Sequence, residues 1–154
     1  MKRNLYLKST SLKTYYLNII GILEKFFLPI ILVLIRLQMA RVFWYSGLTK
    51  ISDWQSTIYL FENEYKVPLV SPELAAYLSA TTELSTPVLL VFGFMTRLAA
   101  IPMLVMTLVI QYTYLNREEH IYWMLLLGIL ICQGAGKLSV DYLIKIRFHL
   151  KLLA

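Results

Sequence analysis

The chain has 154 residues, the length of one domain, and 58% of them are hydrophobic while only 16% are charged. Soluble domains have roughly 45–50% apolar and about 25% charged residues, so this composition is typical of a membrane protein. The net charge of +6 does not indicate a nucleic-acid partner, because the basic residues lie between long apolar runs. One cysteine, Cys132, and two distant histidines allow no intrachain disulfide and show no metal-ligand spacing, so no metal site is predicted.

Four segments are apolar and long enough to cross a hydrocarbon core of roughly 30 Å, which takes about 20 helical residues. They cover residues 26–46, 74–94, 98–115, and 121 to beyond 136. Pro87 and Pro102 fall inside the second and third segments, where they can bend a helix and free backbone carbonyls. The sequence therefore predicts an all-α membrane protein, a bundle of four transmembrane helices.

Residues that start helices support these boundaries. Ser71 before Pro72 is typical of an N-cap followed by proline in the first turn. Asn116 with Glu119, and Ser52 with Gln55, have the spacing of a capping box. The second of these predicts a short interfacial helix in the first outer loop, within residues 52–65.

The distribution of Lys and Arg predicts the orientation. One side of the membrane would carry ten basic residues and the other only Lys50, Lys66 and Arg117, so both termini are expected in the cytoplasm. The ten are Lys2, Arg3, Lys8, Lys13, Lys25, Arg97, Lys137, Lys145, Arg147 and Lys151.

Residues 1–25 alternate lysines with aromatic residues and leucines. We interpret them as an amphipathic cytoplasmic segment, with a disordered tail as the alternative. Residues 26–154 would form the transmembrane domain. These first residues lack the small-residue cleavage site of a secretory signal.

Charged and polar residues at membrane depth are the candidate site. Arg36 and Arg41 lie in the first span, Glu83 in the middle of the second, and Gln111 in the third. A charge at the bilayer centre costs about 2.5–3.5 kcal/mol on insertion scales, so Glu83 is expected to pair with Arg36, Arg41 or both. Such a pair either holds two helices together or lines a pocket for a polar or redox-active molecule. Proton or ion conduction fits one acid and two fixed cations poorly.

The stretch "ICQGAGKLSVD", residues 131–141, has a glycine-rich loop followed by lysine. A phosphate-binding loop needs a glycine five residues before Gly136 and a hydroxyl residue directly after Lys137, but Ile131 and Leu138 stand there. No nucleotide is therefore expected. The glycines can instead end the fourth helix, and Ser139 can cap a following short helix that contains Asp141.

Three stretches together resemble the DoxX family of four-helix bacterial membrane proteins: "RLQMARVFWYSGLTKI", "ELAAYLSATTELSTPVLLVFGFMTRLAA" and "QGAGKLSVD". The likeness covers about residues 33–144, and the chain has Ala135 and Lys137 where the family usually has proline and arginine. The residues that carry it are Arg36, Gly47, Lys50, Glu83, Gly93, Thr96, Arg97, Gly134, Gly136, Lys137, Ser139 and Asp141.

The resemblance implies a multi-pass protein of the bacterial cytoplasmic membrane, associated with redox or stress-response systems. Family members are associated with sulfur-compound oxidation that delivers electrons to quinone, and with thiol or superoxide defence. Some accompany modified metal-stress peptides. We expect an accessory subunit that contacts membrane lipid and subunits of a redox or peptide-modification system, with a quinone or lipid between its helices. A quinone-linked oxidoreductase subunit with its own site at Arg36, Arg41 and Glu83 is the alternative, and a small transporter is a third. Catalytic activity and homo-oligomerisation stay open.

Overall fold

The computed structural model describes the backbone of residues 2–114 and 117–152 and the side chains of 12–114 and 117–148. Every regular element in these residues is a helix, which confirms the all-α class. The elements are α1 (Lys2–Ile22), the π-helix η1 (Leu23–Phe27), α2 (Leu28–Ser52), α3 (Trp54–Leu60), the π-helix η2 (Phe61–Tyr65), α4 (Pro72–Phe92), α5 (Thr96–Thr113), α6 (Glu118–Gln133) and α7 (Val140–Leu152).

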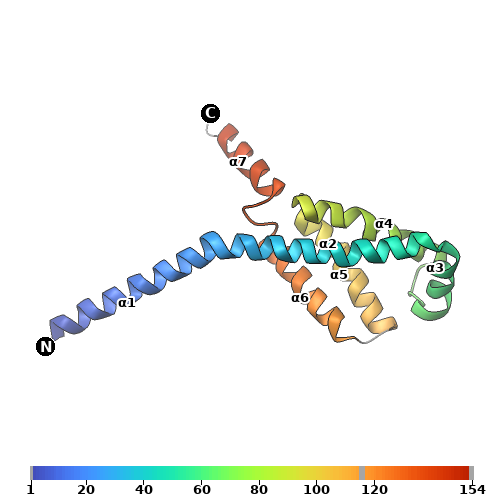
Figure 1. Cartoon of the computed structure of the whole chain (residues 1–154), viewed down its shortest axis with the longest axis horizontal. Helices are drawn as coiled ribbons and strands as arrows, with labels where there is room; N and C mark the ends of the chain where they lie inside the picture. Colours follow the sequence, from blue (N-terminus) through green and yellow to red (C-terminus); the bar gives the residue numbers. More distant parts are fainter. Residues whose placement is uncertain (1, 115–116, 153–154) are drawn as a thin grey trace.

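Four of these helices form a bundle. Helix α2 packs against α4 and α6, and α5 packs between α4 and α6 (Figure 1). The common core takes residues from all four helices: Leu32, Ile35, Met39, Ala40, Phe43, Leu90, Ala99, Ala100, Met103, Leu127 and Leu130. Helix α7 leaves the bundle at the end where α4 turns into α5 (Figure 1).

Helix α5 shows how the bundle buries its small and polar residues and exposes large apolar ones on its outer face. Helix α5 buries Thr96, Ala99, Ala100, Met103 and Thr107, at the spacing of one helix face. Its opposite face exposes large apolar residues, namely Leu98, Ile101, Val105 and Leu108. An apolar outer face, with small residues where helices contact one another, is typical of helices that pack in lipid.

Three helices of the described chain are long and apolar enough to cross a membrane. They are Leu12–Ser52, Pro72–Phe92 and Thr96–Thr113. The expected fourth span corresponds to α6, which has 16 residues and a length of about 24 Å at 1.5 Å per residue. Four spans and their orientation therefore stay a prediction.

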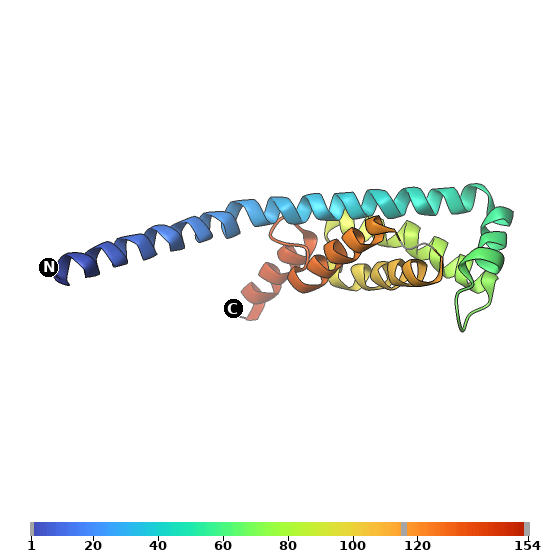
Figure 2. The same ribbon diagram turned by 90° about the horizontal axis from the view of Figure 1, so that it is seen from below.

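The N-terminal helix continues into the bundle. Helix α1, η1 and α2 follow one another without a break, and Figure 2 shows them as one long rod that extends well beyond the other helices. Phe26, Phe27, Ile30 and Ile31 are about half exposed on this rod. The described part of the expected N-terminal segment, residues 2–25, is thus helical and continuous with α2, while its position on a membrane surface stays a prediction.

The connection between α2 and α4 has one N-cap as expected and one that differs. The Ser71 hydroxyl accepts a hydrogen bond from the backbone N–H of Leu74 at 3.4 Å, as expected. The prediction of Ser52 as the cap of α3 is wrong, because α2 runs through Ser52. Asp53 is the cap, and its carboxylate accepts bonds from the N–H (3.0 Å) and hydroxyl (2.6 Å) of Ser56. These bonds lower the pKa of Asp53. The expected cap Asn116 lies outside the described residues.

Asp141, in the first turn of α7, ties that helix to the turn between α4 and α5. Its carboxylate accepts hydrogen bonds from the backbone N–H groups of Met95 (2.8 Å) and Thr96 (3.1 Å), and its own N–H donates to the Gly93 carbonyl (3.0 Å). Helix α5 has no side-chain cap from its own N-cap residue, Met95. Asp141 therefore supplies the oxygens that a local cap would supply, and its negative charge suits a helix N-terminus.

Arg36 is buried in the same place. Its Nη2 donates to the Leu138 carbonyl at 2.7 Å, and a Cβ on Gly93 would coincide with its Nη1. The Ser139 hydroxyl donates to the Gly136 carbonyl at 2.5 Å and accepts from the N–H of Tyr142 at 3.2 Å, which confirms Ser139 as the cap of α7. We call the group Arg36, Gly93, Ser139 and Asp141 the clasp, and the end of the bundle that it occupies the clasp end.

Replacing Gly93 with alanine should open the clasp. Gly93 has φ +64°, which alone costs a non-glycine residue roughly 1–2 kcal/mol, and the new methyl group would displace the Arg36 guanidinium. We expect Gly93→Ala to lower the midpoint of chemical unfolding in detergent and the amount of protein in the membrane.

The control is Gly128→Ala on α6, where an added Cβ meets nothing within 4 Å. That change should be neutral or slightly stabilising, because alanine favours the helix. Equal unfolding midpoints for the two variants would contradict the close contact at Gly93.

Candidate functional site

A buried ion pair joins α2 and α4 in the interior of the bundle. The Lys50 ammonium lies 2.7 Å from Oε2 and 2.9 Å from Oε1 of Glu83. Glu83 is 2% exposed and the Lys50 side chain 12%. The Lys50 ammonium also donates to the Ser46 hydroxyl at 3.0 Å, and the Ser79 hydroxyl donates to Oε1 of Glu83 at 3.4 Å. Each charged group therefore has the opposite charge and one serine hydroxyl as hydrogen-bond partners.

The expected pairing of Glu83 with Arg36 or Arg41 is wrong, because the helices have a different register. A Cβ on Gly47 would lie 3.1 Å from the Glu83 Cβ, so Gly47 and Glu83 stand at the same height. Arg36 is eleven residues from Gly47, about 16 Å along the axis. It therefore lies at the clasp end instead of at mid-span. Arg41 is exposed on α2 and takes no part in the pair.

The sequence Gly47-x-x-Lys50 explains why lysine makes the contact. Positions three apart share a helix face, and Cα–Cβ bonds lean toward the helix N-terminus. The Lys50 side chain consequently reaches back along α2 toward the height of Gly47. Glycine at 47 lets α4 approach closely, since an added Cβ would lie 2.9 Å from Cδ2 of Leu84.

A small cavity of about 90 Å³ adjoins Glu83. His120 and Trp123 of α6 line it, and His120 is 7% exposed. The His120 Nδ1 lies 2.9 Å from Oε1 of Gln111, and this oxygen also accepts from the Arg117 N–H at 3.2 Å. Gln111 thus connects α5 to the start of α6, as an interhelical hydrogen bonder would.

His120 is the residue that sequence reasoning missed. The signal was a helical face: His120, Trp123, Leu127 and Leu130 recur at intervals of three and four, and three of the four are buried. Among the described residues, no group of three or more His, Cys, Asp or Glu side chains could hold a metal ion.

An apolar groove lies on the other side of Ser79. It has a volume of about 490 Å³ and runs between α4 and α5 beside η2 and residues 66–70. Most of its lining is aliphatic, and the polar exceptions are Ser79, Thr82 and Tyr65. Burial, with the nearby carboxylates of Glu83 and Glu64, raises the pKa of Tyr65, so its hydroxyl stays protonated at neutral pH. Ser79 thus links the groove to the ion pair.

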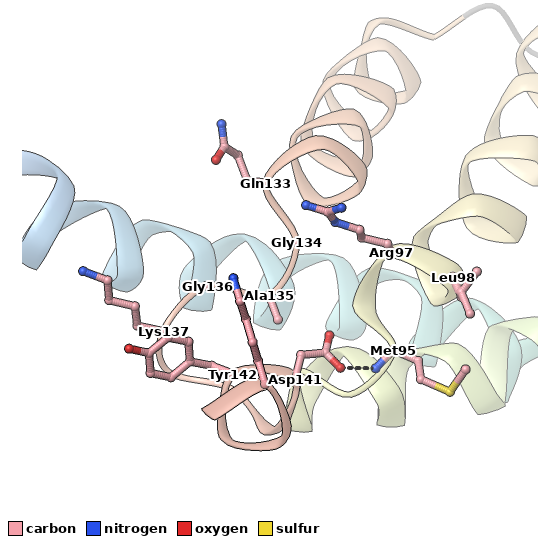
Figure 3. Close-up of a pocket in the computed structure, with 11 residues that line it drawn as sticks. Met95, Arg97, Leu98, Gln133, Gly134, Ala135, Gly136, Lys137, Asp141 and Tyr142 are labelled. Carbon is pink, nitrogen blue, oxygen red and sulfur yellow. Dashed lines mark hydrogen bonds between the residues drawn. The ribbon is translucent and has the colours of Figure 1, made fainter. Parts of the chain in front are cut away.

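The remaining family-pattern residues gather at the clasp end. Arg97 donates from Nη2 to the Cys132 carbonyl at 3.0 Å, which satisfies one of the last carbonyls of α6. Gly134 and Gly136 have φ of +76° and +79°, the left-handed backbone that lets the chain leave α6. Lys137 and Asp141 belong to a second hollow, of about 530 Å³ (Figure 3). The structure therefore does not bring these residues to Glu83.

Breaking the buried pair should cost more stability than replacing it. Glu83→Ala strands the Lys50 ammonium, and loss of one partner of a buried pair costs roughly 3–5 kcal/mol. The double variant Lys50→Met/Glu83→Leu removes both charges, and apolar replacements of similar volume are often neutral. We expect the unfolding midpoint in detergent to fall strongly for Glu83→Ala and to recover in the double variant.

Glu118→Ala is the matched control, since Glu118 is exposed at the start of α6. It should unfold like the unchanged protein. If Glu83→Ala and Glu118→Ala unfold alike, Glu83 does not hold a buried cation.

The DoxX family matches residues 31–115, more than half of the chain, from α2 to just beyond α5. A protein of Haemophilus influenzae (strain ATCC 51907 / DSM 11121 / KW20 / Rd), described as an uncharacterized protein, is 30% identical over 128 residues, which cover 74% of this chain and 83% of that relative. No solved structure matches the chain. The extent of the family match, together with the helical bundle that carries its residues, shows that the chain belongs to the DoxX family.

Proposed function

We propose that this DoxX-family protein is an accessory subunit of a redox or stress-response system in a bacterial cytoplasmic membrane, and that it holds a quinone or a lipid in the groove between α4 and α5. The observation that carries the proposal is the groove itself: about 490 Å³, nearly all apolar, with one serine that reaches the buried ion pair. Ligand sites of this kind combine an apolar wall with a few polar groups that set the orientation.

The polar groups suit a quinone ring. Tyr65 keeps its proton and can donate to a carbonyl. The Ser79 hydroxyl donates its hydrogen bond to Glu83. Its oxygen therefore has lone pairs free on the groove side, and these can accept a hydrogen bond from the hydroxyl of a quinol. The aliphatic residues that make up most of the wall suit an isoprenoid or acyl chain.

A second candidate function is a quinone-linked oxidoreductase subunit. The observation that favours it is the hydrogen bond from Ser79 to Glu83, which connects a groove-bound hydroxyl group to a carboxylate able to take up a proton. The electrons would pass to an acceptor on another subunit. Bound quinol and a Glu83-dependent rate of its oxidation in the assembled system would separate this function from the accessory one.

The contents of the groove can be identified directly. The purified protein should release a quinone in stoichiometric amount on extraction with organic solvent. Phospholipid alone would assign the groove to lipid only if the groove-filling variant described next loses it, and a protein free of both molecules would overturn the proposal.

Filling the groove should expel its occupant. Val105 lines the groove and is 52% exposed, so Val105→Trp can occupy the space without disturbing the core. We expect this variant to reach normal abundance and unfold normally but to lose its bound molecule in the same extraction assay.

Leu108→Trp is the control, because Leu108 is also an exposed residue of α5 but does not line the groove. It should retain the molecule. Equal retention by the two tryptophan variants would place the binding site elsewhere.

The proposal includes four spans, with α1, the α4–α5 turn and α7 in the cytoplasm, because basic residues gather on that side. Alkaline phosphatase fused after Asn63 in the outer loop should be active outside the membrane, and the same enzyme fused after Arg97 should be inactive. A fluorescent protein fused after Lys145 should fluoresce in the cytoplasm. Phosphatase activity at Arg97 would reverse the assigned orientation.

A further inference from the structure

The hollow at the clasp end has a chemistry unlike that of the groove. It lies where the first turn of α5 meets the link between α6 and α7 and has a volume of about 530 Å³. Three cationic side chains line it, those of Arg97, Lys137 and Lys145. Figure 3 shows Arg97 and Lys137 on opposite sides of the link, and Asp141 turned toward Met95.

The positive charge of this hollow is not neutralised from within. Asp141 is the one carboxylate in its lining, and both of its oxygens accept backbone N–H groups of the α4–α5 turn. In the part of the chain that the structure describes, the ion pairs are Lys50 with Glu83 and Arg117 with Glu119, so neither lysine of the hollow has one. Three positive side chains therefore face one carboxylate whose oxygens already have partners, and the excess positive charge favours binding of an anion.

Arg97 is held in place for such a role. Its Nη2 donates to the Cys132 carbonyl, and this contact fixes the guanidinium at the end of α6. The other donors of the fork stay available, and a guanidinium matches the geometry of phosphate oxygens. The N-terminus of α5 is already taken by Asp141, so an anion here must bind to side chains.

The edge of the hollow is apolar. Leu98 and Met95, which also line it, are 58% and 44% exposed. Leu98 lies in the first turn of a helix that is apolar enough to cross a membrane. Cations beside an exposed apolar face at the end of a span fit an amphiphile whose charged group and chain diverge at that point.

We propose that this hollow binds the phosphate of an anionic phospholipid, with the headgroup held by Arg97, Lys137 and Lys145 and the acyl chain along Leu98. Basic pockets between membrane helices recognise phosphate headgroups in this way. The proposal is independent of what the groove between α4 and α5 contains.

The test uses the whole protein in nanodiscs of phosphatidylcholine with or without phosphatidylglycerol. Native mass spectrometry should show retained phosphatidylglycerol, and the unfolding temperature should rise when this lipid is present. Lys137→Gln/Lys145→Gln should weaken retention about thirtyfold, since each basic residue near anionic lipid contributes a factor of about five.

Lys13→Gln/Lys25→Gln is the control, because it removes the same charge from exposed residues of the N-terminal rod. It should retain the lipid. An equal loss in both double variants, or equal retention of both lipids by the unchanged protein, would overturn the proposal. Glycerol phosphate and inorganic phosphate are added as competitors, and displacement of the lipid by either at equal concentration would assign the hollow to a soluble phosphate and overturn the lipid assignment.

Discussion

The pairing of Lys50 with Glu83 constrains every other part of the bundle. An ammonium and a carboxylate removed from water remain charged only while each stays within reach of the other, so α2 and α4 have little freedom to slide. Gly47 makes this possible, because it allows the two backbones to approach at the height of the glutamate. The position of α4 then sets the wall of the groove. Ser79, four residues before Glu83 on the same helix, lines that wall and donates to the carboxylate.

The residues of the family pattern divide into two groups with different tasks. Gly47, Lys50 and Glu83 hold the interior of the bundle together. The others close its clasp end, where a carboxylate from α7 caps α5 and an arginine from α2 holds the link that follows α6. Opposite ends of the bundle also differ in charge. Glu62 and Glu64 lie in η2, and Glu73, Glu118 and Glu119 lie in the first turns of α4 and α6, whereas Arg97, Lys137 and Lys145 lie at the clasp end.

The helices and their N-caps can be predicted from local sequence. The partner of Glu83 cannot, because it depends on how two helices align. Apolar length predicts the helices, and Ser71 and Ser139 mark helix starts because an N-cap involves neighbours within a few residues. The partner of Glu83 depends on how far α2 slides along α4, which no single helix encodes. If the centres of the two apolar segments lie at the same depth, Arg36 is expected opposite Glu83. The actual register came from close approach at Gly47 and from the backward lean of the Lys50 side chain.

The candidate site was predictable in part for the same reason. Glu83 is unusual for its depth alone, and Gln111 for its polarity in an apolar run, so both could be selected by reading the chain. His120 looks like a loop residue by its nearest neighbours, and its place on the buried face of α6 shows only in the spacing of the residues that follow. Arg41 shows the reverse error, since charge within an apolar segment does not determine which way a side chain faces.

Pro87 gives α4 a mechanical property of its own. It is fully buried one turn after Glu83, and because proline has no N–H, the backbone carbonyl of Glu83 lacks its usual helical donor. The backbone of α4 therefore bends most easily next to Glu83, where one helical hydrogen bond is missing. The first half of α4 is held by the Lys50–Glu83 ion pair and by its packing against Phe61, and its C-terminal end is held by the clasp. Bending at this joint would tilt the first half relative to α5 and change the width of the groove while both fastenings stay intact.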